Sequence, residues 1–284
     1  KTYNNSSCKK APREKIIWVF GSSTTYGYGV DDYQTIPSQL SKKLKLRGED
    51  WCVMNFGRGW YFSSQELLEY TKLIAKTKKL PNYVFFIDGA NDFFNLFGSS
   101  DFLPQGSGNI SSLNFYNKIF HNRLSRRIFG DPIVSFQDNG QGRLPDPCDI
   151  SSNLPITKSC EKLIKKATNR MIKNWEVASK LSKSYNINFI PILQPGPLYQ
   201  HYFTNPFSKG IYENNHRYSG IGYSQMDSIN SKSREKMRSL KYIDASTAFK
   251  IPNESCKMPY VDTVHYSGCG SKLIADLILK RIKP

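Results

Sequence analysis

The sequence predicts an α/β protein in which helices cover both faces of a central parallel sheet of about five strands. Two observations lead to this class. Short apolar runs alternate with amphipathic stretches along most of the chain, and within the runs consecutive residues are apolar. Strands buried on both faces have this pattern, and they are typical of parallel sheets. The alternation of strand and helix also favours a parallel sheet over a β-sandwich.

The first third of the chain contains three expected strands and two expected helices. The apolar runs at 15–20, 51–56 and 83–87 predict strands, and glycines end the first two runs. Residues 36–46 place apolar side chains at helical spacing among lysines, which predicts an amphipathic helix. A second helix is expected from Ser63 to about Thr77, because serines are favourable N-caps and an acidic residue suits the first turn.

The rest of the chain adds two strands and a long insertion. Residues 93–159 are rich in Gly, Ser, Asn and Pro, and we interpret them as an insertion beside the site, with a short helix near 114–129. Strands are expected next at 187–193 and 241–244. Helices are expected at 160–185, at 223–240 and at 267–282, and an aromatic-rich loop at 195–222.

Length and composition limit the organisation of the chain. Its 284 residues suit one large domain, and 39% hydrophobic and 13% aromatic residues exclude a disordered chain. No apolar run reaches the roughly 18–20 residues that span a bilayer. We expect an extended lead-in over residues 1–14 and a single domain over 15–284. The chain starts at Lys1 without a methionine, so a signal peptide or a membrane anchor is suspected upstream.

Polar residues follow two of the expected strands, and a third polar group precedes the last expected helix. The segment Gly21-Ser-Ser-Thr-Thr-Tyr-Gly27 follows the first strand, and Gly89-Ala-Asn-Asp92 follows the third. Asp262 and His265 precede the last helix. Ligands of parallel sheets bind outside the carboxyl ends of the strands, so we expect these groups to converge there. A serine, a histidine, an acid and amide donors are what acyl transfer requires.

These three groups, together with the segment Asn55-Phe-Gly-Arg-Gly-Trp60, resemble the four motifs of the SGNH (GDSL-type) hydrolases, in the family's order and over nearly the whole chain. The resemblance implies a flavodoxin-like three-layer α/β/α sandwich and a serine esterase. It places the nucleophile at Ser23, the general base at His265 and the acid that orients the base at Asp262. One departure stands out, because Ser22 occupies the position of the family's usual Asp. That Asp is not a member of the triad, so only the geometry of the turn is put in doubt.

The resemblance also implies an oxyanion hole. Its donors would be the backbone N–H of Ser23, the side chain of Asn91 and a glycine of the segment Asn55-Phe-Gly-Arg-Gly-Trp60. We favour Gly59 as this glycine, with Gly57 as the second choice. No cofactor and no metal is expected for this chemistry.

The substrate is less constrained than the reaction. Trp60 lies beside the oxyanion segment and Gln194 ends the fourth strand, so both are candidate substrate-binding residues. We expect a carbohydrate O-acetylesterase that removes O-acetyl groups through an acyl-enzyme. An O-acyltransferase that modifies a cell-envelope or extracellular polysaccharide would use the same residues. A non-catalytic carbohydrate-binding module on the same fold is a third possibility.

Six cysteines are present, at positions 8, 52, 148, 160, 256 and 269, and none forms a Cys-x-x-Cys pair. A structural zinc site is therefore not expected. Local pairing favours Cys148–Cys160 and Cys256–Cys269, which leaves Cys8–Cys52. Disulfides would indicate a periplasmic or extracellular protein. Six buried free thiols in a cytosolic enzyme are the alternative.

The formal net charge of +17 favours anionic partners. The basic residues are spread over many short segments, without a nucleic-acid-binding motif, so specific nucleic-acid binding is not expected. We expect an O-acylated carbohydrate or another small ester as substrate, with an anionic polymer or a membrane surface nearby.

Overall fold

The computed structural model describes residues 8, 15–94, 158–196, 226, 241–249, 256–262 and 264–283. A parallel five-stranded sheet lies at its centre, in the order β2-β1-β3-β4-β5. The strands are β1 (Ile16–Gly21), β2 (Cys52–Asn55), β3 (Tyr83–Asp88), β4 (Asn188–Leu193) and β5 (Ile243–Asp244). This strand order is that of the flavodoxin-like sheets, and the predicted fold class is thus confirmed.

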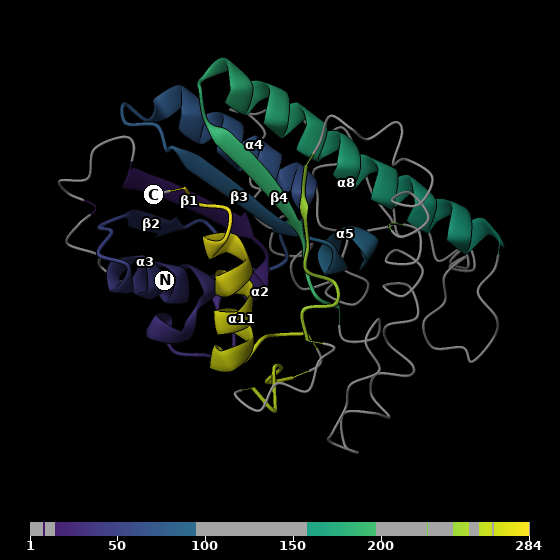
Figure 1. Ribbon diagram of the computed structural model, residues 1–284. Coiled ribbons are helices and arrows are strands. Elements are labelled where there is room, and N and C mark those ends of the chain that lie inside the picture. Colours follow the sequence, from purple (N-terminus) through teal and green to yellow (C-terminus); the bar gives the residue numbers. More distant parts are fainter. Residues whose placement is uncertain are drawn as a thin grey trace, which may run out of the picture.

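Helices cover the two faces of the sheet (Figure 1). The helices α3 (Ile36–Leu46) and α11 (Gly268–Leu279) lie together on one face. On the other face lie α4 (Ser63–Lys76) and α8 (Lys158–Ser184), which also pack on each other. The expected helices at 36–46, 63–77, 160–185 and 267–282 therefore exist, with small shifts at their ends.

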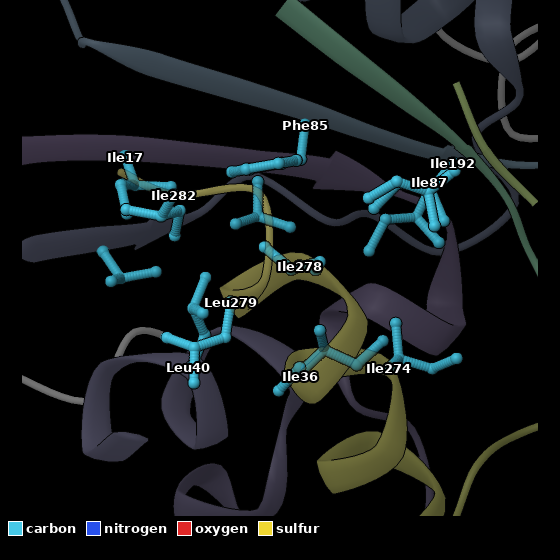
Figure 2. Packing of buried hydrophobic residues seen from close by; sticks show 14 of the residues in the cluster. Ile17, Ile36, Leu40, Phe85, Ile87, Ile192, Ile274, Ile278, Leu279 and Ile282 are labelled. Atoms are coloured by element: carbon cyan, nitrogen blue, oxygen red, sulfur yellow. The ribbon is translucent and has the colours of Figure 1, made fainter. Parts of the chain in front are cut away.

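The strands β1 and β3 are buried at every position, which explains their continuous apolar sequences. Successive side chains of a strand point to opposite faces. Ile17 and Phe85 pack under α3 and α11 in the cluster drawn in Figure 2, whereas Trp18 and Phe86 pack on the other face with Trp175 of α8. Each face of the sheet thus has its own hydrophobic core, and the two cores together hold the strand ends in place.

The described part of the chain contains three short helices that were not predicted. They are α2 (Ser23–Tyr26), α5 (Ala90–Phe94) and the 3-10 helix η2 (Asp32–Gln34). Helices of three to five residues make barely one turn, so they show no hydrophobic periodicity in the sequence. The expected helix at 114–129 lies outside the described residues, and of the one at 223–240 only Met226 is described. Most of the 93–159 insertion and of the 195–222 loop also lie outside them.

Candidate active site

The site lies at the carboxyl edge of the sheet, where β1 has β2 on one side and β3 on the other. Ser23 follows β1 directly, and Asn91 follows β3. Chain connections leave β1 and β3 in different directions at such a point, which opens a crevice between the two strand ends. His265 reaches the same place from the segment before α11. The structure therefore brings together residues that are up to 242 positions apart.

The turn that carries Ser23 requires close approach of the backbone. A side chain at Gly21 would lie 2.1 Å from Oγ1 of Thr25 and 3.2 Å from the carbonyl oxygen of Ile87, so only glycine fits. The chain then enters α2, where the N–H groups of Thr25 and Tyr26 donate to the carbonyl of Ser22. Ser23 thus stands at the first position of a helix, where backbone N–H groups have no partner inside the helix.

Ser22, which stands where the resemblance expects Asp, is compatible with this turn. Its hydroxyl is buried and lies 3.2 Å from the hydroxyl of Thr24. Both groups are uncharged, so no ionised group is buried at this position. The turn keeps its helix, and the departure from the motif leaves the half-buried Ser23 within hydrogen-bonding distance of His265.

Ser23, His265 and Asp262 form a continuous chain of hydrogen-bonded side chains. Nε2 of His265 lies 2.9 Å from Oγ of Ser23, and Nδ1 lies 2.6 Å from Oδ2 of Asp262. This arrangement suits a neutral imidazole that donates from Nδ1 to the carboxylate and accepts the serine proton at Nε2. The three side chains thus have the arrangement that acyl transfer requires of a nucleophile, a base and an orienting acid.

Asp262 keeps its negative charge through several donors. Partial burial alone would raise the pKa of Asp262, but the backbone N–H groups of His265 and Val264 and the His265 ring together hold it below its ordinary value. Both N–H groups donate to Oδ1 at 2.8 Å. Oδ2 is thereby directed at the imidazole. The three-residue spacing of the motif allows one carboxylate to make both kinds of contact.

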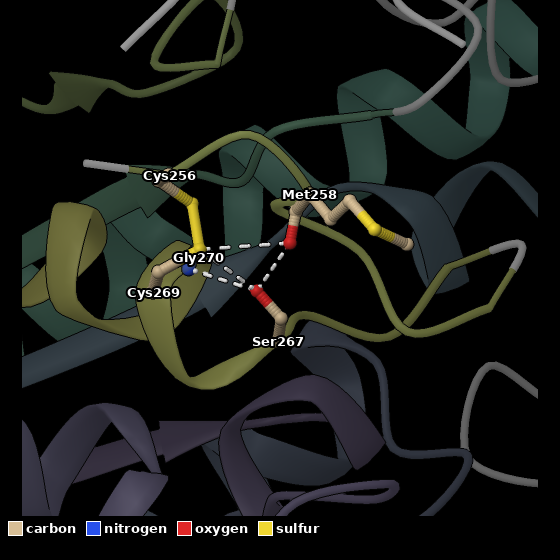
Figure 3. Close-up of a disulfide and its surroundings, with 5 residues drawn as sticks. All are labelled: Cys256, Met258, Ser267, Cys269 and Gly270. Atoms are coloured by element: carbon tan, nitrogen blue, oxygen red, sulfur yellow. Dashed lines mark hydrogen bonds between the residues drawn. A yellow bond between two sulfur atoms is a disulfide. The ribbon is translucent and has the colours of Figure 1, made fainter. Parts of the chain in front are cut away.

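The segment that carries Asp262 and His265 is held against the start of α11. A disulfide joins Cys256 to Cys269, and the hydroxyl of Ser267 caps the helix by accepting from Gly270 while it donates to the carbonyl of Met258 (Figure 3). Backbone hydrogen bonds pair the two arms of the segment on either side of Asp262. The predicted Cys256–Cys269 disulfide is confirmed and closes a loop around the two residues.

The second described disulfide joins Cys8 to Cys52 of β2, also as predicted. It connects the lead-in to the edge of the sheet. Cys148 and the side chain of Cys160 lie outside the described residues, so their pairing stays a prediction. Among the residues that the structure describes, no cluster of His, Cys, Asp or Glu has the arrangement of a metal site.

The two candidate oxyanion glycines differ in what their backbones do. The N–H of Gly57 donates to Oδ1 of Asn55 at 2.8 Å, and a side chain at Gly57 would run into the backbone of Tyr26. Gly57 therefore packs the loop onto the turn of Ser23, and its N–H is engaged within the protein. This favours Gly59, the first choice from the sequence, as the glycine that faces a substrate oxygen.

Asn91 is oriented by the loop that follows β2. Its side-chain amide donates to the carbonyl of Tyr61 at 2.8 Å. The next residue, Asp92, is fully buried and accepts hydrogen bonds from the backbone N–H and the hydroxyl of Ser63. The loops after β2 and β3, which carry Gly59 and Asn91, are thus joined twice. Sequence reasoning did not give Asp92 a role, although it belongs to the Gly-x-Asn-Asp motif.

Behind this junction lies a group of buried carboxyl groups. Burial raises the pKa of Asp92 to about 6, although Ser63 and the guanidinium of Arg170 oppose the shift. Burial raises the pKa of Asp88 well above its ordinary value, and the charge of the neighbouring Asp92 raises it as well. The pKa of Glu66 is raised well above its ordinary value, first by burial and then by the charges of Asp88 and Asp92. The buried layer behind Asn91 and Ser63 therefore contains carboxyl groups that favour their protonated forms.

The two predicted substrate residues have different environments. Trp60 is 67% exposed and has a positive φ of 67°, a conformation that costs energy for a residue with a side chain. It therefore presents its ring to solvent beside Gly59. Gln194 is 1% exposed, and its N–H donates to the carbonyl of Asp88 at 2.8 Å. Its side chain is enclosed by protein, so Trp60 is the better placed of the two to meet a substrate.

No protein-family model and no curated protein matches the chain. Solved structures similar to it include a lipolytic protein of the G-D-S-L family from Veillonella parvula, with a TM-score of 0.46 and 14% identity over 93% of this chain and 96% of that one. An acetyl xylan esterase, AlAXEase, has a TM-score of 0.43 and 17% identity over 94% and 100%. A lipase/acylhydrolase from Enterococcus faecalis has a TM-score of 0.46 and 15% identity over 94% and 95%.

The similar structures include GDSL-type proteins. This is the family that the sequence motifs resemble. The fold assignment itself rests on the strand order of this chain, and the chemistry rests on the contacts at its carboxyl edge.

The buried position of Glu66 predicts how stability depends on pH. Because its pKa is raised in the folded protein, the folded state keeps a proton that the unfolded chain releases above the ordinary value of 4.5. The contribution of Glu66 to stability is complete below pH 4.5 and should be lost as pH rises through its raised folded-state pKa, by about 1.4 kcal/mol per pH unit. Glu66→Gln should flatten this slope and be more stable than the native protein at pH 7, as measured by urea unfolding. Glu69→Gln on the same helix is the matched control. A Glu66→Gln protein with the native slope would contradict the raised pKa.

Proposed function

We propose that this protein is a serine esterase of the SGNH type that hydrolyses O-acetyl groups on a carbohydrate. The observation that carries the proposal is the unbroken contact from Ser23 through His265 to Asp262. Isolated serines and histidines are common at loop ends. Their combination with an oriented carboxylate, at the carboxyl edge of a parallel sheet, is what nucleophilic acyl transfer needs.

Acylation begins at Ser23. Its Oγ attacks the ester carbonyl carbon while its proton passes to Nε2 of His265, and Asp262 stabilises the imidazolium that forms. The tetrahedral intermediate collapses as Nε2 gives this proton to the leaving alcohol oxygen. An acyl-enzyme on Ser23 remains. Water then attacks this ester, its proton moves to Nε2 and returns to Oγ, and the carboxylic acid leaves.

The oxyanion that forms in both steps needs donors on the side of the site away from His265. The N–H of Ser23, the N–H of Gly59 and the amide of Asn91 are assigned to this role. Two of these groups come from loops that Asp92 and Tyr61 join to each other. A donor that is already held in place needs no reorganisation when charge develops, and it interacts more strongly with the oxyanion than with the neutral ester carbonyl.

A carbohydrate is the favoured substrate because aromatic rings stand at the surface beside the site. Trp60 and Tyr28 are both well exposed there.

Within the described residues no helix is long and apolar enough to cross a bilayer. The described disulfides support a periplasmic or extracellular location, since such bonds persist in oxidising compartments.

The proposed binding partner beyond the sugar in the site is an anionic polymer that carries this sugar. On α8, the exposed residues Lys162 and Lys166 lie on the turns before Arg170, whose side chain contacts the backbone of Asp92 next to Asn91. The lysines are therefore on the part of α8 that approaches the site. Phosphate groups of a polymer whose ester-bearing sugar is in the site would be attracted to them.

Ser23→Ala tests the proposed function. It should abolish both labelling by a fluorophosphonate and acetate release from para-nitrophenyl acetate and O-acetylated oligosaccharides, because no acyl-enzyme forms without the hydroxyl. The control is Ser184→Ala, because Ser184 is an exposed serine at the end of α8. Wild-type acetate release by Ser23→Ala would refute the assignment. Absence of labelling in the folded native protein would favour the non-catalytic binding module. Acetate release that falls when an acceptor sugar is added, with new acetylated sugar formed, would indicate the acyltransferase.

Asn91→Ala tests the oxyanion hole. Removal of one such donor should lower kcat for para-nitrophenyl acetate by about 10²–10³ and change KM little, since the charge develops only in the transition state. Asn174→Ala, which removes an amide that contacts Ser63 and Ser64 in the supporting layer, is the comparison. A kcat for Asn91→Ala close to the native value would exclude Asn91 from the oxyanion hole.

Salt dependence tests the anionic polymer. With an O-acetylated glycan joined by phosphodiester links, KM should rise several-fold when ionic strength increases from about 0.05 M to 0.5 M, because salt screens exposed charges. Turnover of para-nitrophenyl acetate should not change. The double variant Lys162→Gln/Lys166→Gln should weaken the salt effect, whereas Lys183→Gln at the far end of α8 should not. An equal salt effect on both substrates would argue against the polymer.

A further inference from the structure

A hollow of about 600 Å³ opens on the surface in the loop between α2 and η2. Residues 26–31 and Gln34 line it. None of the motifs that indicated an esterase assigns a function to this loop beyond Gly27. Its lining combines two tyrosine rings, a carboxylate and an amide, which is the mixture of apolar surface and polar groups found in small-molecule sites.

Tyr28 separates the hollow from the proposed catalytic residues. Its ring centroid lies 5.5 Å from that of His265. A side chain at Gly59 would lie 2.6 Å from the Tyr28 hydroxyl, so this hydroxyl stands directly over the proposed oxyanion glycine. A molecule in the hollow that touches Tyr28 is therefore next to both the general base and the oxyanion donors.

Two other residues of the lining, Gly29 and Gln34, place the hollow on the His265 side of Ser23. A side chain at Gly29 would meet Val261, and one at Gly268 would meet the amide of Gln34. Val261 and Gly268 flank His265 in the chain. Since Nε2 of His265 must give its proton to the leaving oxygen, this is the side on which the alcohol part of the ester lies.

The chemistry of the lining indicates what this alcohol is. Tyr28 is 43% exposed, and Tyr26 stands at 89° to it with a centroid distance of 5.2 Å. An exposed ring face carries partial negative charge and attracts the C–H groups of a sugar ring. The carboxylate of Asp31 accepts hydrogen bonds from hydroxyls. Gln34 is held by the N–H of Asp31, which donates to its Oε1 at 3.2 Å, so the amide has a defined direction.

The negative charge of Asp31 favours neutral sugars over anionic sugars in the hollow. Among the described residues that line the hollow, Asp31 is the carboxylate and none is a lysine or arginine. A negative group near Asp31 would be repelled, whereas a neutral hydroxyl would be bound. The anionic groups of a polymer would instead lie outside the hollow.

We propose that this hollow binds the neutral, hydroxyl-rich sugar unit that bears the ester, through ring contact with Tyr28 and hydrogen bonds to Asp31 and Gln34. The inference rests on the proposed esterase activity and names the subsite for its leaving alcohol. Asp31 and Gln34 determine specificity in this proposal and take no part in proton transfer.

The test compares acetyl esters that differ only in their alcohol: para-nitrophenyl acetate, a mono-O-acetylated methyl glucoside and the corresponding methyl glucuronide. Asp31→Asn and Gln34→Ala should each raise KM for the glucoside about ten-fold, the effect of one lost hydrogen bond, and leave kcat nearly unchanged. Their kcat/KM for para-nitrophenyl acetate should stay within about two-fold of native. Asp31→Asn should also improve kcat/KM for the glucuronide, because the repulsion is removed.

Asp50→Asn is the matched control, because Asp50 is exposed before β2 at the opposite edge of the sheet. Equal losses on all three esters, or an unchanged KM for the glucoside, would overturn the sugar subsite while leaving the esterase in place. A native protein that hydrolyses none of the three esters would overturn the esterase proposal itself. An improved glucuronide rate with a weakened glucoside rate is a result that a merely structural role for Asp31 would not produce.

Discussion

The contact between Nε2 of His265 and Oγ of Ser23 is the interaction on which the site depends, and it joins residues 242 positions apart. It forms because β1 lies inside the sheet and α11 packs with α3 on one face of that sheet. The Cys256–Cys269 disulfide and the cap at Ser267 then set where the chain enters α11. A loose entry would allow the imidazole to turn away from Ser23, since His265 is positioned by Asp262, by its own backbone and by the ring of Tyr28.

A second constraint acts on the oxyanion side. Gly59 and Asn91 belong to loops after different strands, and their relative position is set by buried hydrogen bonds of Asp92 with Ser63 and of Asn91 with Tyr61. Carboxyl groups buried behind this junction favour protonation, so the layer that orients the donors is not optimised for stability at neutral pH. Buried ionisable groups next to a site are common where geometry has to be maintained against solvation.

Much of the fold followed from local pattern. The runs at 15–20 and 83–87 are apolar throughout because both faces of β1 and β3 are covered, and α3 has the bounds that its periodicity predicted. The short helices α2 and α5 were missed, since they arise from the sharp turns after β1 and β3 and not from a helical sequence. Tyr28 and Asp92 were passed over for a related reason: each acts through a residue distant in sequence, and neither has a local pattern of its own.

By itself the sequence predicted the fold class, the order of the strands along the chain, and Ser23, Asn91, Asp262 and His265 as candidate site residues, because side-chain periodicity and motif spacing are properties of short segments. Tertiary structure alone decided that Gly57 packs against the turn of Ser23, that Gln194 is enclosed, and that Tyr28 links His265 to a hollow containing Asp31. These depend on which segments the parallel sheet brings side by side, and contact between distant segments leaves no mark on local composition.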